Sequence, residues 1–312
     1  MIVAAGLGTR LRPLTELLPK PALPVRGVPL IAFQLALLHR HGVREVAINL
    51  HHLPERLEAA AEGWCPPGLA LRFSREAELL GTGGGIRKLA GFLRESDPCL
   101  VIGGDMVLDY DLSALVGWHR AGGHTASLLL REDARGAQFG TIGVDHEGRV
   151  RRVATRFDLG GESRAGIYAW ANVLSPAIFD SLPDRESFSH LDDWWVPAQA
   201  RGAADVRGLV ADADACRWEP VGTPSEYLHA NLSVDAVSYL DLDRASQRAG
   251  ARCIRGADGR VSIVLGAEAS LGVGAELERA VVFAGERVPA GFVGKGGVFA
   301  AGSWVPARGE PA

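Results

Sequence analysis

Short apolar runs alternate with stretches of helical spacing over the first third of the chain. Three segments repeat apolar residues every three or four positions, as amphipathic helices do: residues 29–41, 53–63 and 85–94. Four apolar runs have the length of strands: residues 2–5, 43–50, 69–74 and 99–102. Strands that alternate with helices predict right-handed crossovers and a parallel sheet. Any ligand is then expected beyond the carboxyl ends of the strands.

Beyond residue 121 the pattern changes to shorter elements. The predicted strands here are residues 125–130, 140–145, 150–156 and 166–173, and we expect them to wall a pocket. One predicted helix, residues 112–120, precedes this change, and the predicted helices after it are residues 176–182, 190–201 and 222–232. Asp111 stands where an N-cap belongs, directly before the first of these helices. The fold class is therefore α/β, with a Rossmann-like, mixed but mainly parallel sheet.

The last sixty residues show a repeat that the rest of the chain does not. Leu265, Leu271 and Leu277 follow one another at hexapeptide spacing, and Gly266 and Gly272 each come after a leucine. This is typical of a hexapeptide β-helix, although a Gly/Ala-rich sandwich edge or a loosely ordered tail remains an alternative. The predicted organisation is a large domain over residues 1–232, a helical connector over 233–250, a short β-helix over 251–306 and a tail over 307–312.

Composition narrows the class of protein. The chain has 312 residues and a formal net charge of -4, with no basic run, so we expect neither nucleic acid nor a membrane surface as partner. Its four cysteines are scattered without CxxC spacing, which argues against a zinc site or a disulfide framework. The apolar stretch after Met1 is too short for a targeting segment. A cytoplasmic location fits these features best.

The first glycine-rich segment reads as a phosphate site. Gly6 and Gly8 follow a buried strand and let backbone N–H groups approach an anion. Arg10 adds a planar fork of donors, and Lys20 adds a point charge between two prolines. The segment lacks the third glycine of a dinucleotide fold and the Gly-Lys-Ser/Thr of a P-loop. Two kinds of cation on one glycine loop suggest a polyphosphate ligand.

The full spacing makes a family resemblance specific. Gly6-x-Gly8-Thr9-Arg10-x-x-Pro13-x-Thr15, followed by Pro19-Lys20-Pro21, resembles the signature of the sugar-1-phosphate nucleotidylyltransferases. The resemblance implies transfer of a nucleoside monophosphate from a nucleoside triphosphate to a sugar 1-phosphate, giving a nucleotide sugar and pyrophosphate. It also implies a GT-A-like catalytic domain and a short left-handed β-helix at the C-terminus. The oligomeric state stays open, and a homo-oligomer formed through the β-helix is one option.

The resemblance assigns roles residue by residue. It implies that Arg10 binds the leaving pyrophosphate and that Lys20 binds the α-phosphate or the incoming sugar phosphate. Gly103-Gly104-Asp105 follows a buried strand and matches the family's Gly-Asp motif, in which the aspartate holds Mg²⁺. A turn or N-cap role for Asp105 is the alternative. The residues implied to bind nucleotide are Ala5, Gly6, Gly8, Thr9, Glu76, Gly81, Thr82 and Gly83, and those implied to bind sugar are Gly140 and Thr223.

A second glycine-rich loop spans residues 81–85, with a helix expected to start near Ile86. Glycines allow close backbone approach to a flat base, and free N–H groups at a helix start suit an anion. The loop has features of both the guanylyltransferase and the uridylyltransferase branches, so the sequence leaves base and sugar open.

Two departures from the family pattern bear on activity. Pro220 stands where the family supplies a second metal carboxylate, and Glu219 is the candidate replacement although strand alternation points it to the opposite face. The family's Glu-Lys-Pro segment is missing, with Arg152 and Arg156 as candidate substitutes. These departures motivate the alternative of a catalytically impaired relative that binds nucleotide or nucleotide sugar and regulates a partner.

Other residue clusters have simpler interpretations. His190 with Asp192 and Asp193 resembles a metal cluster, but an N-capped helix start is the preferred interpretation. Trp170 is expected to be a packing residue.

Overall fold

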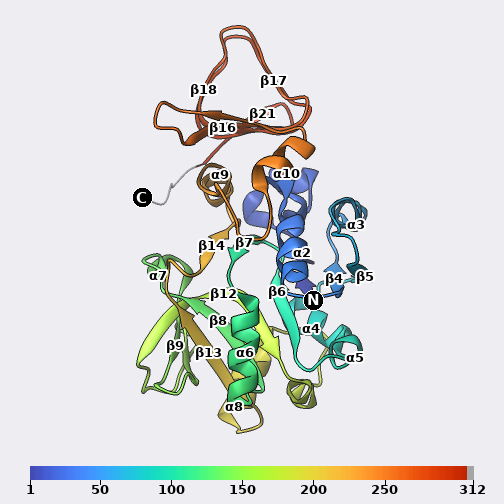
Figure 1. Cartoon of the computed structure of the whole chain (residues 1–312), viewed down its shortest axis with the longest axis vertical. Coiled ribbons are helices and arrows are strands. Elements are labelled where there is room, and N and C mark those ends of the chain that lie inside the picture. Colours follow the sequence, from blue (N-terminus) through green and yellow to red (C-terminus); the bar gives the residue numbers. More distant parts are fainter. Residues whose placement is uncertain (308–312) are drawn as a thin grey trace.

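The computed structural model describes residues 1–307 and is built on one large sheet (Figure 1). The sheet has ten strands: β1 (Ile2–Val3), β4 (Glu45–Leu50), β5 (Ala70–Arg75), β6 (Cys99–Gly103), β8 (Ala126–Arg131), β9 (Ile142–Val144), β10 (Val150–Val153), β11 (Phe157–Asp158), β12 (Arg164–Leu174) and β13 (Val206–Ala211). Eight of them follow the order β11-β10-β9-β12-β6-β1-β4-β5, while β8 pairs with β12 and β13 pairs with β8.

The half of the sheet around β1 is parallel, as the alternation of strands and helices predicts. Strand β1 lies between β4 and β6, and Ile2 is the register partner of Ile48 on one side and Ile102 on the other. All three isoleucines are fully buried. Because β1 and β6 are parallel neighbours, the residues that follow Val3 and Gly103 emerge at the same edge of the sheet. This brings the first glycine loop beside Asp105.

The other half of the sheet centres on β12, which pairs in antiparallel fashion with β6, β8 and β9, while β13 pairs in parallel with β8. The chain also contains strands that the sequence analysis did not predict. Besides β13, these include the antiparallel pair β2 (Pro24–Val25) and β3 (Val28–Pro29). They also include β7 (Met106–Asp109) and β14 (Arg217–Pro220), which pair with each other in antiparallel fashion. Only two residues separate the end of β6 from the start of β7, so the apolar residues of β7 look like a continuation of the same segment in the sequence.

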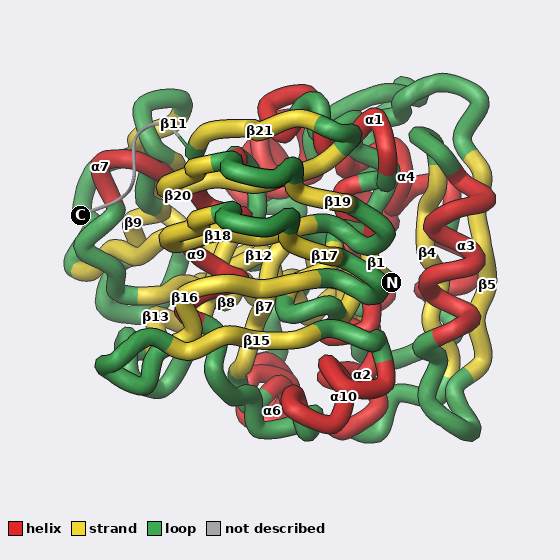
Figure 2. The backbone as a smooth tube through the Cα atoms, turned by 90° about the horizontal axis from the view of Figure 1, so that it is seen from above, coloured by secondary structure: helices red, strands yellow, loops and turns green. Residues whose placement is uncertain are grey.

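Helices cover the sheet and connect its strands (Figures 1 and 2). The α-helices are α1 (Leu14–Leu17), α2 (Leu30–Arg40), α3 (Pro54–Gly63), α4 (Gly81–Lys88), α5 (Ala90–Leu93), α6 (Leu112–Gly122), α7 (Gly136–Phe139), α8 (Val196–Ala200), α9 (Pro224–Ser233) and α10 (Leu242–Arg248). Three short 3-10 helices, η1 (Thr9–Leu11), η2 (Lys20–Ala22) and η3 (Pro176–Ser181), and one π-helical turn, η4 (His190–Trp195), complete the set.

Several helix predictions are confirmed and others need correction. Asp111 caps α6 as predicted, since its carboxylate accepts hydrogen bonds from Ser113 N and Ala114 N. The helix predicted at residues 85–94 starts earlier, at Gly81, and is divided into α4 and α5. The helix predicted over 190–201 is a π-helical turn followed by α8. Within the predicted connector 233–250, the helical residues are Leu242–Arg248 and Ser233, which is the last residue of α9.

The C-terminal segment forms a separate five-stranded sheet, in the order β15-β16-β18-β20-β21. Its strands are β15 (Arg252–Arg255), β16 (Val261–Leu265), β18 (Glu276–Val282), β20 (Val293–Ala300) and β21 (Ser303–Pro306), with the short parallel pair β17 (Ser270–Leu271) and β19 (Arg287–Val288) beside them. Strands β16, β18 and β20 are parallel: β16 pairs with β18 and β18 with β20, the later strand lying roughly three hexapeptides further along the chain in each pair. Strands β15 and β21 pair antiparallel, so the sheet is mixed and the predicted left-handed β-helix is not confirmed.

Close stacking of successive turns explains the glycines in this segment. A Cβ on Gly266 would lie 2.5 Å from the backbone of Ala284, and one on Gly272 would lie 2.4 Å from that of Ala290. The sheet packs against α9 through a shared apolar core that includes Tyr227 and Phe283, whose rings lie 6.0 Å apart. The predicted tail over 307–312 falls outside the described residues apart from Ala307. No helix in residues 1–307 is long and apolar enough to cross a membrane.

Candidate active site

Both glycine-rich segments meet at one pocket of about 140 Å³ at the edge of the sheet. The pocket is lined by Val3, Ala4, Gly6, Lys20, Pro21, Thr82, Gly103, Asp105 and Trp170. Four of these residues, Gly6, Lys20, Thr82 and Asp105, were predicted from the sequence. The lining therefore joins five stretches of the chain: the end of β1 with the first glycine loop, the start of η2, the start of α4, the end of β6 with the residues after it, and β12.

The first glycine loop has a conformation that demands its second glycine. Gly8 has a φ of 62°, and a Cβ there would lie 2.7 Å from Thr15 Cγ2. Thr15 Oγ1 donates a hydrogen bond of 2.9 Å to Gly8 O, which fixes the loop. Gly6 and Thr9 are open to solvent, whereas the side chain of Ala5 is buried. The exposed backbone before Thr9 is thus free to receive an anion.

Lys20 and Asp105 form an ion pair on the wall of this pocket. Lys20 Nζ lies 2.7 Å from Asp105 Oδ2, and the Lys20 side chain is only 14% exposed against 43% for Asp105. Asp105 O also accepts a hydrogen bond from Val221 N at 3.0 Å, which ties the loop after β6 to the end of β14. The carboxylate is therefore held in position while one side of it faces the pocket.

Arg10 stands at the entrance to α9. A Cβ on Gly222 would lie 3.1 Å from Arg10 Nη2, so the guanidinium lies against the backbone there. Gly222 N donates a hydrogen bond of 2.6 Å to Glu226 Oε2. The Arg10 side chain is exposed and available to an anion.

Glu76 is placed in the core rather than in the pocket. It is 5% exposed, its Oε1 accepts from Asn49 Nδ2 at 2.8 Å, and its Oε2 accepts from Leu80 N at 3.3 Å. Asn49 Oδ1 in turn accepts from Ala4 N at 2.7 Å. This buried chain of polar groups connects β1 to the start of α4, so Glu76 holds the two glycine-rich segments together.

The second glycine-rich segment is helical, which corrects the prediction of a loop over residues 81–85. Its glycines make room for the chain around Phe188. A Cβ on Gly83 would lie 2.3 Å from the Phe188 ring, and one on Gly81 would lie 2.7 Å from Phe188 O. Steric crowding by a distant segment therefore explains these glycines, and only Thr82 of this segment lines the pocket.

Trp170 is a pocket residue that the sequence analysis took for a packing residue. It lies at a register shift of β12, between Tyr168 and Asn172, and has a φ of 55°. Its ring packs 4.8 Å from that of His190 and 5.1 Å from that of Tyr168. A Cβ on Gly103 would lie 3.1 Å from Trp170 Cβ, which explains a glycine at the end of β6.

Comparisons with known proteins agree with this geometry. A family model described as nucleotidyl transferase matches residues 1–236. The chain belongs to this family. Mannose-1-phosphate guanylyltransferase of Mycobacterium tuberculosis is 31% identical over 307 residues, covering 94% of this chain and 82% of that protein. UTP--glucose-1-phosphate uridylyltransferase of Synechocystis is 29% identical over 204 residues, covering 60% and 52%. The predicted membership of the sugar-1-phosphate nucleotidylyltransferases is thereby confirmed, and with it the class of enzyme.

Solved structures share the fold of this nucleotidyl transferase. HddC from Yersinia pseudotuberculosis superposes with a TM-score of 0.61 at 22% identity, covering 74% of this chain and 96% of that chain. A putative glucose-1-phosphate thymidylyltransferase from Bacillus anthracis superposes with a TM-score of 0.63 at 18% identity, covering 78% and 97%.

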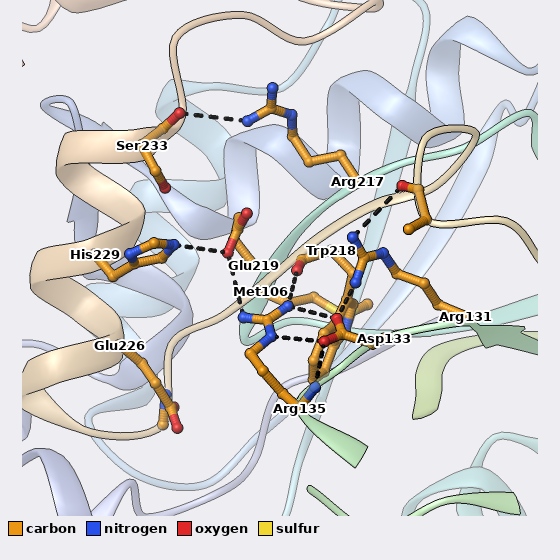
Figure 3. Close-up of polar contacts among 12 residues, drawn as sticks. Met106, Arg131, Asp133, Arg135, Arg217, Trp218, Glu219, Glu226, His229 and Ser233 are labelled. Atoms are coloured by element: carbon orange, nitrogen blue, oxygen red, sulfur yellow. Dashed lines mark hydrogen bonds and ion pairs between the residues drawn. The ribbon is translucent and has the colours of Figure 1, made fainter. Parts of the chain in front are cut away.

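Glu219 lies in a charged cluster outside the pocket that contains Asp105 (Figure 3). Its Oε2 lies 3.5 Å from His229 Nε2 and 3.7 Å from Arg135 Nη1, and it accepts no hydrogen bond. Burial acts to raise the pKa of Glu219, but contact with His229 and the charges of Arg135 and Arg217 hold it below its usual range. The strand alternation expected at β14 is therefore kept, and the structure does not bring the carboxylates of Glu219 and Asp105 together.

Arg135 pairs with a carboxylate and packs against aromatic rings in the same cluster (Figure 3). Its Nη2 donates to Asp133 Oδ2 at 2.7 Å, and its guanidinium lies 5.5 Å from the ring centres of both Phe139 and Trp218. Asp133 also pairs with Arg131. This network connects the segment before Gly140 to β14 and α9.

The predicted sugar residues lie at element ends. Gly140 has a φ of 76° at the end of α7. Thr223 caps α9, where its Oγ1 accepts from Glu226 N at 3.2 Å. Of the candidate substitutes for the missing lysine, Arg152 bonds Glu162 and Thr141, and Arg156 pairs with Asp192 at 2.5 Å. Both guanidinium groups are therefore engaged by other side chains.

The residues fit a divalent cation through a single carboxylate. Within residues 1–307 no group of three or more His, Cys, Asp or Glu side chains is arranged to hold a metal ion. Mg²⁺ binds readily through one or two carboxylates together with water and substrate phosphates. Asp105 offers such a carboxylate at the pocket wall.

Proposed function

We propose that this nucleotidyl transferase transfers a guanosine monophosphate unit from GTP to a hexose 1-phosphate of the mannose 1-phosphate type. The observation that carries the proposal is the pocket in which Lys20 and Asp105 pair beside the first glycine loop and Thr82. The choice of guanine and mannose is supported by the relative from Mycobacterium tuberculosis, which aligns over 94% of this chain and carries the name mannose-1-phosphate guanylyltransferase.

In the proposed reaction an oxygen of the sugar phosphate attacks the α-phosphorus of the triphosphate, and pyrophosphate leaves. A phosphate monoester is already a competent nucleophile, so the protein needs no general base. It must hold two anions together, align them and neutralise their charge. Lys20 would bind the α-phosphate or the sugar phosphate, and Arg10 the leaving pyrophosphate. The exposed backbone of Gly6, Gly8 and Thr9 would bind the triphosphate.

Asp105 would hold Mg²⁺ in this site, with substrate phosphates completing the coordination. When bound, the ion would neutralise charge that develops on the phosphates. Glu219 as a second ligand stays a prediction and would require its carboxylate to leave Arg135 and His229. Roles for Ala5, Gly81, Thr82 and Gly83 in nucleotide binding, and for Gly140 and Thr223 in sugar binding, are part of the same proposal.

A uridylyl transferase is the second candidate, because the Synechocystis relative named for that activity is 29% identical over 204 residues. The regulatory alternative is not favoured, since the relatives carry enzyme names and Lys20 and Asp105 are in place. The domain limits at residues 232 and 250, a left-handed β-helix over 251–306, a homo-oligomer and a cytoplasmic location stay predictions.

The test is pyrophosphate release from each nucleoside triphosphate with a panel of sugar 1-phosphates and Mg²⁺. Fastest turnover with GTP and mannose 1-phosphate is the expected result, and it should be lost in Asp105→Ala and Arg10→Ala. Fastest turnover with UTP would favour the second candidate. Binding of nucleotide without turnover under any pairing would argue for the regulatory alternative.

A further inference from the structure

A chain of buried polar groups runs from the pocket into the sheet. Thr82 lines the pocket, and its Oγ1 lies 2.7 Å from His190 Nδ1. His190 Nε2 lies 3.0 Å from the Tyr168 hydroxyl. The Tyr168 hydroxyl lies 2.7 Å from Asn172 Oδ1, and Asn172 Nδ2 lies 2.9 Å from Val101 O. Only Thr82 among these four side chains lines the pocket.

The direction of each hydrogen bond follows from the deepest member. Val101 O can only accept, so the Asn172 amide nitrogen faces it and Oδ1 faces Tyr168. The single hydroxyl hydrogen of Tyr168 is therefore donated to Asn172. His190 Nε2 must then donate to the Tyr168 oxygen, because two acceptors facing each other would repel.

The protonation of the His190 ring also fixes the direction of its hydrogen bond with Thr82. The ring is 2% exposed, and burial lowers its pKa to about 3, so it is neutral and carries one N–H. With Nε2 protonated, Nδ1 accepts, and the Thr82 hydroxyl hydrogen is donated to it. Thr82 Oγ1 also accepts from His190 N at 3.1 Å. One lone pair of the Thr82 oxygen remains.

We propose that Thr82, oriented by His190, Tyr168 and Asn172, is a specificity-determining hydrogen-bond acceptor that receives an N–H from the Watson–Crick edge of guanine. This rests on the proposed function, which makes a guanine nucleotide the ligand. Because its own hydrogen is committed to His190, Thr82 cannot donate to a carbonyl or a bare ring nitrogen. Guanine offers two donors on one edge, N1–H and the 2-amino group.

The orientation of the chain has a direct test that needs no substrate. Nitrogen-15 chemical shifts of the His190 imidazole report which ring nitrogen carries the proton. The expected result is a neutral ring with the proton on Nε2. A proton on Nδ1 would mean that His190 donates to Thr82, and it would overturn the proposal.

The contact with guanine is tested by calorimetric binding of GTP, ITP, 1-methyl-GTP and 2′-deoxy-GTP to wild type, Thr82→Ser and Thr82→Val. ITP lacks the 2-amino group, and 1-methyl-GTP lacks N1–H. Thr82→Val should weaken GTP binding by roughly 10-fold to 100-fold, because it leaves a donor unpaired, while Thr82→Ser should change it little. This effect of Thr82→Val should largely disappear with one of the two analogues, ITP or 1-methyl-GTP, namely the one that lacks the N–H group from which Thr82 accepts.

Two outcomes would contradict the proposal. An equal loss with all four nucleotides would show that Thr82 pairs with no donor on the base, and a loss abolished only with 2′-deoxy-GTP would assign the contact to the ribose. Absence of GTP binding by the wild type, with tight binding of another nucleotide, would instead refute the proposed substrate. These failures are distinguishable because the nitrogen-15 result does not depend on the nucleotide.

His190 is a positioning residue, and its matched control is His119. His119 is also 2% exposed and bonds two hydroxyl groups, those of Ser127 and Ser175, away from the pocket. His190→Phe should release the Thr82 hydrogen and reduce the discrimination between GTP and its weaker-binding analogue by roughly 10-fold. His119→Phe should lower stability and leave this discrimination unchanged. Equal effects of both variants on discrimination would reduce His190 to a packing role.

Discussion

Lys20 Nζ and Asp105 Oδ2 lie 2.7 Å apart, so the cation and the carboxylate that the proposed reaction needs neutralise each other in this structure. Both belong to segments that follow parallel neighbouring strands or pack directly against them. A divalent cation on Asp105 would compete with Lys20 for the same carboxylate oxygen and free the ammonium group for a phosphate. The pair is thus suited to exchange one partner for another when substrates bind.

This competition predicts different effects for the two partners. Asp105→Asn should reduce kcat/KM by about 100-fold or more, because it removes the proposed metal ligand. Lys20→Met should reduce kcat/KM by a similar factor but lower the concentration of metal needed for half-maximal binding. The measurements are pyrophosphate release and Mn²⁺ binding followed by electron paramagnetic resonance.

Asp111→Asn is the matched control, since Asp111 caps α6 through its carboxylate. It should change stability little, because asparagine caps helices about as well as aspartate does, and it should leave metal dependence unchanged. Unaltered metal binding in Lys20→Met would contradict the idea of competition.

The glycines at the start of α4 provide a prediction about stability. Gly84→Ala should destabilise the protein by about 2 kcal/mol or more, because the new Cβ would lie 2.1 Å from Glu186 O. Gly117→Ala in α6 is the control, because a Cβ there meets nothing within 4 Å and alanine favours the helix by roughly 0.5–1 kcal/mol. Urea unfolding measures both. A tolerated Gly84→Ala would show that the segment around Glu186 can move away.

Local motifs made the core of the site predictable from the sequence. Gly8 and Lys20 lie in one short segment, and Asp105 directly follows a buried apolar strand, so topology alone places them at one edge of the sheet. The hexapeptide spacing predicted a β-helix at the C-terminus, which is not confirmed, although β16, β18 and β20 do pair in parallel. The antiparallel β15 and β21 carry no such repeat.

Contacts between residues that are far apart in the chain could not be predicted from the sequence. Thr82 and His190 are 108 positions apart, and their pairing depends on where η4 packs against α4. The pocket position of Trp170 arises from a register shift in β12, which periodicity does not reveal. The glycines near Thr82 had a local explanation as a loop, whereas the structure explains them by the approach of Phe188.

Pro220 allows a test of the missing carboxylate. Residue 220 precedes Val221, whose N–H bonds Asp105 O at 3.0 Å, so its backbone is adjacent to the proposed metal site. Pro220→Asp should lower the Mg²⁺ concentration for half-maximal activity by about 10-fold, because a second carboxylate adds charge to the site. Pro220→Ala is the control and should leave the Mg²⁺ requirement unchanged. The same requirement in both variants would show that residue 220 does not reach the ion.

His119 makes stability depend on pH. Burial, more than the charge of His124, lowers the pKa of His119 to about 4 from an ordinary 6.5. In the folded protein the ring lies within hydrogen-bond distance of the hydroxyl groups of Ser127 and Ser175. Between these two values the unfolded chain binds a proton that the folded protein does not. Stability is therefore highest above pH 6.5 and falls as the pH is lowered towards 4, by about 3 kcal/mol from this group.

The test is urea unfolding at a series of pH values across this window. His119→Gln should be less stable than the wild type at neutral pH, but its stability should fall less steeply as the pH is lowered. The pH dependence that remains is due in part to His124 and His190, whose pKa values are also lowered by burial. His146→Gln changes an exposed histidine and should keep the full slope. A slope in His119→Gln equal to that of the wild type would show that the proton is taken up elsewhere.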